Sequence, residues 1–265
     1  MKRITLIFLI FMFVFNVYGQ KADVTSAILS FNKNDIASAK EFIDKAYNTI
    51  LEKYNNSISI DEKTHSKFWF YRGEIYFKIG ISKDPLVNQL SDNKNAIEIA
   101  TESYQNLLPV DVKMRYNKEA KVKLNYCANN FSIKAIESYN AKDYNLALFY
   151  FEKTLSILDF DAIGRIDTLT IQNAAMSAQH AKKYDRAIEH TKRLISLNYG
   201  GANNYRLISQ LQEEKGDTLA AYKAIKEGRS KYPNDKDLII DEYNYFLKQG
   251  KQDEAIKNLE LAINA

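Results

Sequence analysis

The feature that most constrains the fold of this chain is a set of alanines that recurs along its second half. Ala147, Ala187, Ala221 and Ala255 stand in similar runs of apolar and charged residues, and their separations are 40, 34 and 34 residues. A unit of about 34 residues cannot bury its own apolar face, so neighbouring units must stack to form a continuous core. The recurrence therefore predicts a stack of similar units.

The composition and the breaker residues indicate that each unit is a pair of helices. The chain has only 9 glycines and 3 prolines among its 265 residues, which favours helices joined by short turns. Gly216 and Gly250 fall between apolar runs, where a glycine commonly ends a helix. Small residues at Ala135, Ala175 and Ser209 would let the second helix of a pair approach the first. We predict an all-α fold of antiparallel helix pairs.

An upstream segment carries a recognisable residue pattern. Trp69-Phe-Tyr-Arg-Gly-Glu-Ile-Tyr76 resembles the W-x2-L-G-x2-Y pattern in the first helix of a tetratricopeptide repeat, with Arg72 in place of Leu. The 34-residue period is also that of this family. The resemblance implies a right-handed superhelical solenoid of helix pairs. The first helix of each pair is called the A helix and the second the B helix. The resemblance gives structural positions to eight residues: Trp69, Gly73, Tyr76, Ala147, Ala187, Ala221, Ala255 and Pro233.

The repeats differ in regularity along the chain. Residues 131–265 are predicted to form four regular repeats, continuous with less regular TPR-like helical repeats over 20–130. An insertion is expected near 81–93, around Pro85. The sequence stops within an ordinary B helix, whereas solenoids usually close with a polar capping helix. We therefore expect further repeats, or a partner or self-association that covers the C-terminal face.

The N-terminus reads as a signal peptide over residues 1–19. Lys2 and Arg3 precede an apolar run from Ile4 to Phe15, and Gly19 provides a small residue for cleavage. A span needs about 20 apolar residues, so an uncleaved anchor is the weaker interpretation and no stable membrane insertion is expected after cleavage. The protein is predicted to be exported, either periplasmic, bound to the cell envelope or secreted. With Asp84-Pro-Leu86 and the run Glu227-Gly-Arg-Ser-Lys-Tyr-Pro-Asn-Asp-Lys-Asp-Leu238, the sequence also resembles exported repeat proteins of Bacteroidetes.

Charge and reactive residues argue against catalysis and nucleic-acid binding. Without residues 1–19 the chain has 35 bases and 33 acids, dispersed rather than gathered into a basic face. The single cysteine, Cys127, is predicted to be a buried inert thiol. His65, His180 and His190 lack metal-ligand spacing and are interpreted as surface or boundary residues. The sequence contains no glycine-rich phosphate loop or nucleophile–base motif, so we expect a non-enzyme without cofactor or metal.

The remaining hypothesis concerns the concave groove that the resemblance places along the A helices. A carboxylate clamp typical of the family is not expected, because only Asn173 matches it and Asp237 and Asp241 would repel a carboxylate. With Asp235, these acids are interpreted as charges that favour a helix N-terminus. Helical phase predicts seven groove residues: Gln172, Met176, Gln179, Arg206, Gln210, Glu213 and Asn244.

These observations lead to two functional hypotheses. The first is a non-catalytic protein–protein interaction scaffold of the bacterial cell envelope that binds a peptide or partner protein in the groove. The alternative is a glycan- or small-molecule-binding protein that uses aromatic residues near Trp69, such as Phe70 and Tyr71, as stacking surfaces.

Overall fold

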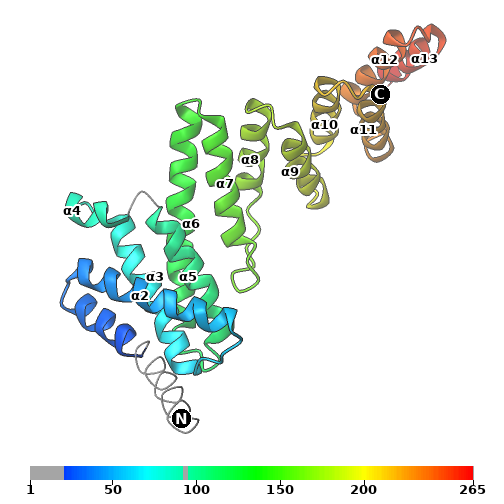
Figure 1. The fold of residues 1–265 in the computed structure, drawn as a ribbon. Coiled ribbons are helices and arrows are strands. Elements are labelled where there is room, and N and C mark those ends of the chain that lie inside the picture. The colour runs from blue at the N-terminus through cyan, green and yellow to red at the C-terminus, as the bar shows by residue number, and fades with distance from the viewer. Residues whose placement is uncertain (1–20, 92–94, 265) are drawn as a thin grey trace, which may run out of the picture. The chain divides into compact units, whose positions relative to one another are not determined.

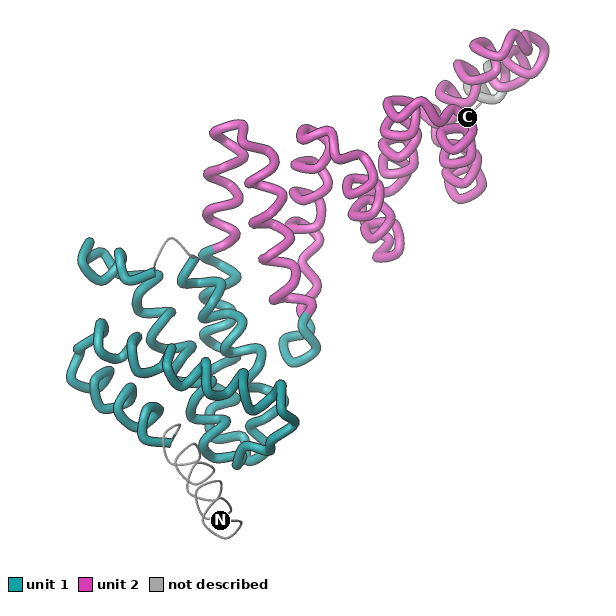
Figure 2. The backbone as a smooth tube through the Cα atoms, viewed as in Figure 1, with its two compact units in different colours: residues 1–130, 160–164 teal, residues 131–159, 165–265 magenta. Residues whose placement is uncertain are grey.

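The computed structural model describes residues 21–91 and 95–264, and helices and turns make up all the secondary structure in them (Figure 1). The predicted signal peptide over 1–19 lies outside the described residues. The chain divides into two compact units (Figure 2). Unit 1 comprises Met1–Asn130 and Phe160–Gly164, and unit 2 comprises Phe131–Asp159 and Arg165–Ala265. No helix in the described part of the chain combines the length and apolarity needed to span a membrane.

Unit 1 contains the less regular helices. A helical segment over residues 21–32 is followed by α2 (Ile36–Asn55) and α3 (Glu62–Ile81), each 20 residues long. A short α4 (Pro85–Asn88) and a 3-10 turn, η1 (Gln89–Ser91), occupy the region of the expected insertion. Helix α5 (Ala96–Val110) then packs against α3. Helix α6 (Asn117–Asn140) begins in unit 1 and continues into unit 2.

Unit 2 is built of helix pairs. The C-terminal part of α6 pairs with α7 (Tyr144–Leu158), and α8 (Thr168–His180) pairs with α9 (Tyr184–Ser196). The next pairs are α10 (Ala202–Glu214) with α11 (Thr218–Lys231), and α12 (Lys236–Lys248) with α13 (Gln252–Asn264). The A helices are thus α6, α8, α10 and α12. This arrangement confirms the predicted all-α fold of helix pairs.

The turns between A and B helices share one backbone feature. Lys142, Lys182, Gly216 and Gly250 each have positive φ, at 63°, 57°, 81° and 71°. A left-handed residue at this position ends the A helix and reverses the chain within two residues. Two of the four B helices begin at an aspartate: Asp143 and Asp217 accept hydrogen bonds from the backbone N–H of residues three positions on.

The small residues lie where helices approach closely. The repeated alanines Ala147, Ala187, Ala221 and Ala255 are at most 1% exposed. Gly73 packs against the ring of Tyr104 on α5 so closely that a Cβ at Gly73 would overlap three ring atoms. Pro233 lies two residues beyond the end of α11, and its carbonyl oxygen accepts a hydrogen bond from Arg229.

Two of the three histidines are buried, which corrects the prediction that all three lie at the surface or boundary. His65 is 9% exposed and shares a hydrogen bond with the Tyr54 hydroxyl, while His190 is 6% exposed. His190 tolerates burial because a carboxylate from another helix, Glu152, accepts its hydrogen bond. Only His180 is exposed, and it stacks on Tyr144.

Candidate functional site

The seven predicted groove residues lie on three A helices of unit 2. Gln172, Met176 and Gln179 follow a spacing of four and three residues on α8, and Arg206, Gln210 and Glu213 repeat this spacing on α10. Such a spacing places side chains on one helix face. Asn244 occupies the position on α12 that Gln210 occupies on α10, one 34-residue period earlier. The seven residues are Gln172, Met176, Gln179, Arg206, Gln210, Glu213 and Asn244, and all are exposed or half-buried. We call this surface the A-helix face.

Two of these residues are engaged in ion pairs with the next A helix. Arg206 Nε donates to Asp241 Oδ2 at 2.7 Å, and Arg206 Nη1 donates to Asp237 Oδ2 at 2.6 Å. The hydrogen bond to Asp241 is the largest cause that raises the pKa of the Arg206 guanidinium above its ordinary value. Glu213 pairs with Lys248 at 3.0 Å. These contacts join α10 to α12, so Arg206 and Glu213 position neighbouring repeats.

The acidic residues of α12 therefore do more than favour its N-terminus. Asp235 is the N-cap and accepts a hydrogen bond from the Leu238 N–H at 3.0 Å, as the predicted helix-start pattern requires. Asp237 and Asp241, by contrast, face α10 and bind Arg206. An interpretation based on the helix terminus alone was incomplete, because the pairing partner lies more than 30 residues away in the sequence.

Sequence reasoning predicted Met176 but missed the exposed apolar side chains that accompany it on the A-helix face. Ile133 and Ile136 on α6 are 57% and 48% exposed, and Leu169 and Met176 on α8 are 61% and 38% exposed. Ile136 and Met176 are 40 residues apart, like Ala147 and Ala187, so they hold the same position in successive repeats. This repeat position holds Ile136 in α6, Met176 in α8, Gln210 in α10 and Asn244 in α12. Its side chain therefore changes from apolar to polar along the unit. An alignment of the repeats on their shared alanines would have revealed this change in side-chain character.

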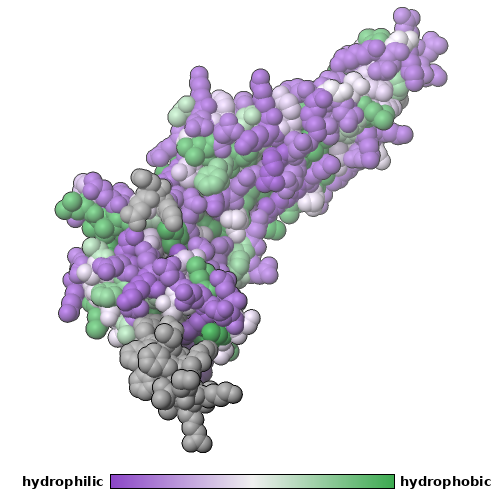
Figure 3. Space-filling model, viewed as in Figure 1, coloured by the Kyte–Doolittle hydropathy of each residue, from purple (hydrophilic) through white to green (hydrophobic). Residues whose placement is uncertain are grey.

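Contacts at the ends of these helices show that α6 and α8 are neighbours. The Tyr139 ring lies edge-on to His180, with centroids 5.8 Å apart. Ala135 of α6 and Ala174 and Ala178 of α8 also belong to one buried core. The exposed Ile136 and Met176 are therefore presented by adjacent helices. In Figure 3, which shows one side of the molecule, hydrophobic side chains interrupt a largely hydrophilic surface.

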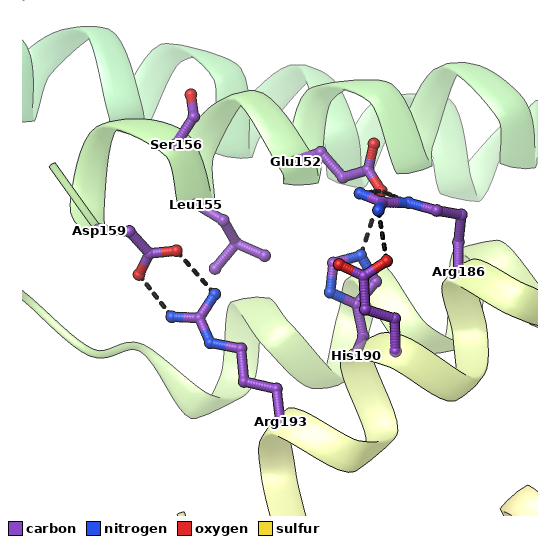
Figure 4. A pocket seen from close by; sticks show the side chains of 8 residues that line it. Glu152, Leu155, Ser156, Asp159, Arg186, His190 and Arg193 are labelled. Carbon is purple, nitrogen blue, oxygen red and sulfur yellow. Dashed lines mark hydrogen bonds and ion pairs between the residues drawn. The ribbon is translucent and has the colours of Figure 1, made fainter. Parts of the chain in front are cut away.

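The B helices of unit 2 form a cavity of about 350 Å³ between α7 and α9 (Figure 4). Glu152 Oε1 accepts hydrogen bonds from Arg186 Nε at 2.8 Å and from His190 Nε2 at 3.1 Å. Asp159 binds Arg193 through two hydrogen bonds of 2.7 and 2.5 Å. Each cationic side chain of this cavity thus already faces a carboxylate.

The charges of this cavity stabilise one another. Burial would raise the pKa of the Glu152 carboxyl, but hydrogen bonds from His190 and Arg186 outweigh it and lower that pKa below its usual range. An ionised Glu152 at neutral pH keeps both partners bound. The cavity therefore links two B helices, and its charges are already satisfied within the protein.

Of the aromatic residues suggested for sugar stacking, Trp69 and Phe70 lie in the core of unit 1 and Tyr71 is half-buried. Trp69 is 3% exposed and Phe70 is 6% exposed. The Trp69 indole packs edge-on against Phe68 at a centroid distance of 4.9 Å, and the Arg72 guanidinium lies 5.8 Å from its ring centre. Stacking on a sugar needs an exposed ring face, so the structure does not support the alternative at Trp69.

The single thiol of the chain is not activated as a nucleophile. Cys127 is buried as predicted, and burial raises the pKa of its thiol to about 11, so the nucleophilic thiolate is scarce at neutral pH. Among residues 21–91 and 95–264, no three His, Cys, Asp or Glu side chains are placed to hold a metal ion. The A-helix face thus offers amides, a few charges and apolar side chains, which suit binding.

Comparisons with known proteins give fold neighbours only. No protein-family model matches the chain, and no curated protein matches it. Solved structures that are similar to it include MamA from Desulfovibrio magneticus RS-1, with 12% identity over 73% of this chain and 94% of that one, at a TM-score of 0.39. YrrB, described as a TPR protein with an unusual peptide-binding site, has 16% identity over 68% and 82%, at 0.38. The type IV pilus biogenesis factor PilW has 15% identity over 83% and 96%, at 0.34.

Proposed function

We propose that this chain, which has the helix-pair architecture of tetratricopeptide repeats, is a non-catalytic scaffold that holds a peptide or partner protein on its A-helix face. The observation that carries the proposal is the exposure of Ile133, Ile136, Leu169 and Met176 on adjacent A helices. Exposed apolar side chains grouped on one surface are typical of interaction sites, and each gains free energy when a partner removes it from water.

The chemistry of the face indicates the form of its partner. Gln172 and Gln179 flank Met176, and Gln210 and Asn244 continue the same surface. Amide side chains both donate and accept hydrogen bonds, so they pair with the backbone of an extended peptide whatever its sequence. The apolar side chains would then select a peptide with apolar residues at the end that lies over α6 and α8.

The proposal places the protein in the bacterial cell envelope. Its support is the pattern of residues 1–19, with two basic residues, an apolar run of 12 and a small residue at Gly19. N-terminal sequencing of the protein purified from its native cells would test export. A mature chain that begins at Gln20 agrees with it, whereas a chain that retains Met1 contradicts it.

Site-specific photocross-linking in cells tests the A-helix face directly. A photoreactive residue would replace Met176, which is 38% exposed, or Phe149 on the B helix α7, which is 40% exposed and serves as the matched control. We expect a discrete cross-linked partner at position 176 and none at 149. Equal cross-linking at both positions, or none at 176, would contradict the proposed face.

A second variant connects the cross-link to affinity. The double variant Ile136→Asp with Met176→Asp places two carboxylates in the apolar part of the face. It should weaken the binding free energy of the captured partner by roughly 2 kcal/mol or more, as loss of an apolar anchor does. Both positions are on the surface, so the helix content measured by circular dichroism should not change. Unchanged affinity would show that the partner binds elsewhere.

A further inference from the structure

A second exposed apolar feature lies in unit 1, on the loop of residues 111–116 between α5 and α6. Val112 is 76% exposed and Met114 is 75% exposed, so both side chains project into solvent. Lys113 stands between them and Arg115 follows, which gives a loop tip that alternates apolar and basic side chains. Neither the core nor the A-helix face uses these residues.

Hydrogen bonds within the loop stabilise a conformation that presents this tip. The buried Asp111 carboxylate accepts hydrogen bonds from the backbone N–H of Tyr116 at 2.7 Å and of Asn117 at 3.2 Å. The Met114 N–H donates to the Asp111 carbonyl oxygen at 2.8 Å, and Met114 has a φ of 52°. A positive φ is unfavourable for methionine, so the surrounding hydrogen bonds maintain it. The exposure of Met114 therefore belongs to an ordered turn.

Contacts to the start of α3 fix where the loop lies. Arg115 binds Glu62 at 2.8 Å, and the Ser66 hydroxyl donates to the carbonyl oxygen of Val110 at 3.3 Å. Tyr116 stacks on Phe70 with centroids 4.3 Å apart. The loop tip and the first turns of α3 therefore form one end of unit 1.

Basic side chains predominate at this end. The bases are Lys21, Lys63, Lys67, Lys113, Arg115 and Lys118, and the exposed or half-buried acids are Asp61, Glu62 and Glu119. This gives six positive against three negative side chains, and the further acids Asp23 and Asp111 are buried. Lys21 borders a small cavity with Asp61 and Lys63, so the first described residue lies at this same end.

We propose that this end of unit 1 is a peripheral docking surface for an anionic lipid bilayer, with Val112 and Met114 entering the headgroup region. Apolar side chains on a projecting tip gain free energy by leaving water at the bilayer interface. Lysine and arginine side chains around them attract anionic headgroups, and their long stems reach past the apolar tip. The proposal is independent of the A-helix face, which belongs to unit 2.

Vesicle co-sedimentation of the chain from Gln20 to Ala265 tests the proposal. We expect binding to vesicles that mix phosphatidylglycerol with phosphatidylcholine, little binding to pure phosphatidylcholine, and weaker binding at high salt. Val112→Ser with Met114→Ser should lower the partition coefficient by about tenfold. Lys113→Glu alone should lower it at least about fivefold.

The matched control uses apolar residues of equal exposure elsewhere. Leu86 on α4 and Leu219 on α11 are both 75% exposed, so Leu86→Ser with Leu219→Ser removes comparable surface and should leave vesicle binding unchanged. A Met114→Trp variant adds an independent readout, because the native Trp69 is buried. Its emission should shift to the blue with anionic vesicles.

Three results would overturn the proposal. The first is no binding of the native chain to anionic vesicles, which would assign the tip to a protein partner. The second is binding that the loop variants and the control variant reduce equally. The third is a Met114→Trp emission that anionic vesicles do not change.

Discussion

Replacement of Gly73 by alanine tests the closest helix approach in unit 1. In a helix, Gly→Ala is normally stabilising by about 1 kcal/mol, because alanine has the higher helix propensity. At Gly73, however, the added Cβ would lie less than 3.0 Å from three ring atoms of Tyr104. The ring is 0% exposed, and its hydroxyl donates to Glu74 at 2.7 Å. Since this ring cannot move freely, the clash should exceed the gain in propensity.

The magnitude follows from these opposing effects. Overpacking a well-filled core commonly costs about 1–3 kcal/mol, and an anchored aromatic ring belongs at the upper end of that range. After subtraction of the gain in propensity, Gly73→Ala should lower the free energy of unfolding by about 2 kcal/mol. With a typical denaturant dependence for guanidinium chloride, the unfolding midpoint should fall by roughly 0.5 M.

The assay uses the single tryptophan of the chain as a local probe. Trp69 lies one helical turn before Gly73 and is 3% exposed, so its emission reports unfolding of unit 1. In a Tyr104→Leu background, the same Gly73→Ala change should no longer destabilise and should raise the midpoint slightly. A midpoint that is unchanged or higher for Gly73→Ala in the native background would refute the close-approach argument.

Three further predictions concern other packing and charge contacts. Arg72→Leu should not lower the stability of unit 1, as measured by Trp69 emission. The Ser103 hydroxyl, which accepts a hydrogen bond from Arg72, also donates one to the Ile99 carbonyl oxygen at 2.6 Å, so it keeps a partner when the guanidinium is removed. Ala221→Trp should cost on the order of 1–3 kcal/mol in thermal unfolding of unit 2 followed by circular dichroism, since Ala221 is 1% exposed. Because the pKa of Glu152 is lowered in the folded state, its carboxylate stabilises the fold at pH values above its unfolded pKa of about 4.3. This stabilisation is lost as the pH falls through the folded pKa. Glu152→Gln should therefore destabilise at neutral pH and approach the native chain in strong acid, as urea unfolding would show.

The helix pairs of unit 2 could be predicted because their signals are local and repeated. The recurring alanines mark the close contacts of the B helices, and Gly216 and Gly250 mark two turns with positive φ. The equivalent turns at Lys142 and Lys182 carry no such signal, since lysine rarely adopts this conformation. Those turns follow from their place in the repeat rather than from their residue type.

The contacts that hold neighbouring repeats together could not be predicted from residue patterns. Glu152 and His190 are 38 residues apart, and Arg206 and Asp241 are 35 residues apart. Each residue alone is typical of a solvated helix surface, and only the packing of adjacent repeats brings the two charges together. For the same reason His190 was predicted to lie near the surface, although its ring is buried against Glu152.

The distribution of these ion pairs also explains why the A-helix face, rather than the B helices, is the candidate binding surface. Between α7 and α9 every cation of the cavity binds a carboxylate, so a charged ligand would have to displace an existing ion pair. On the A-helix face the ion pairs of Arg206 and Glu213 are confined to α10 and α12. The apolar side chains of α6 and α8 have no such internal competitor, because the exposed parts of Ile136 and Met176, 48% and 38%, face solvent. A partner that covers these two side chains gains free energy without first breaking a contact within the protein.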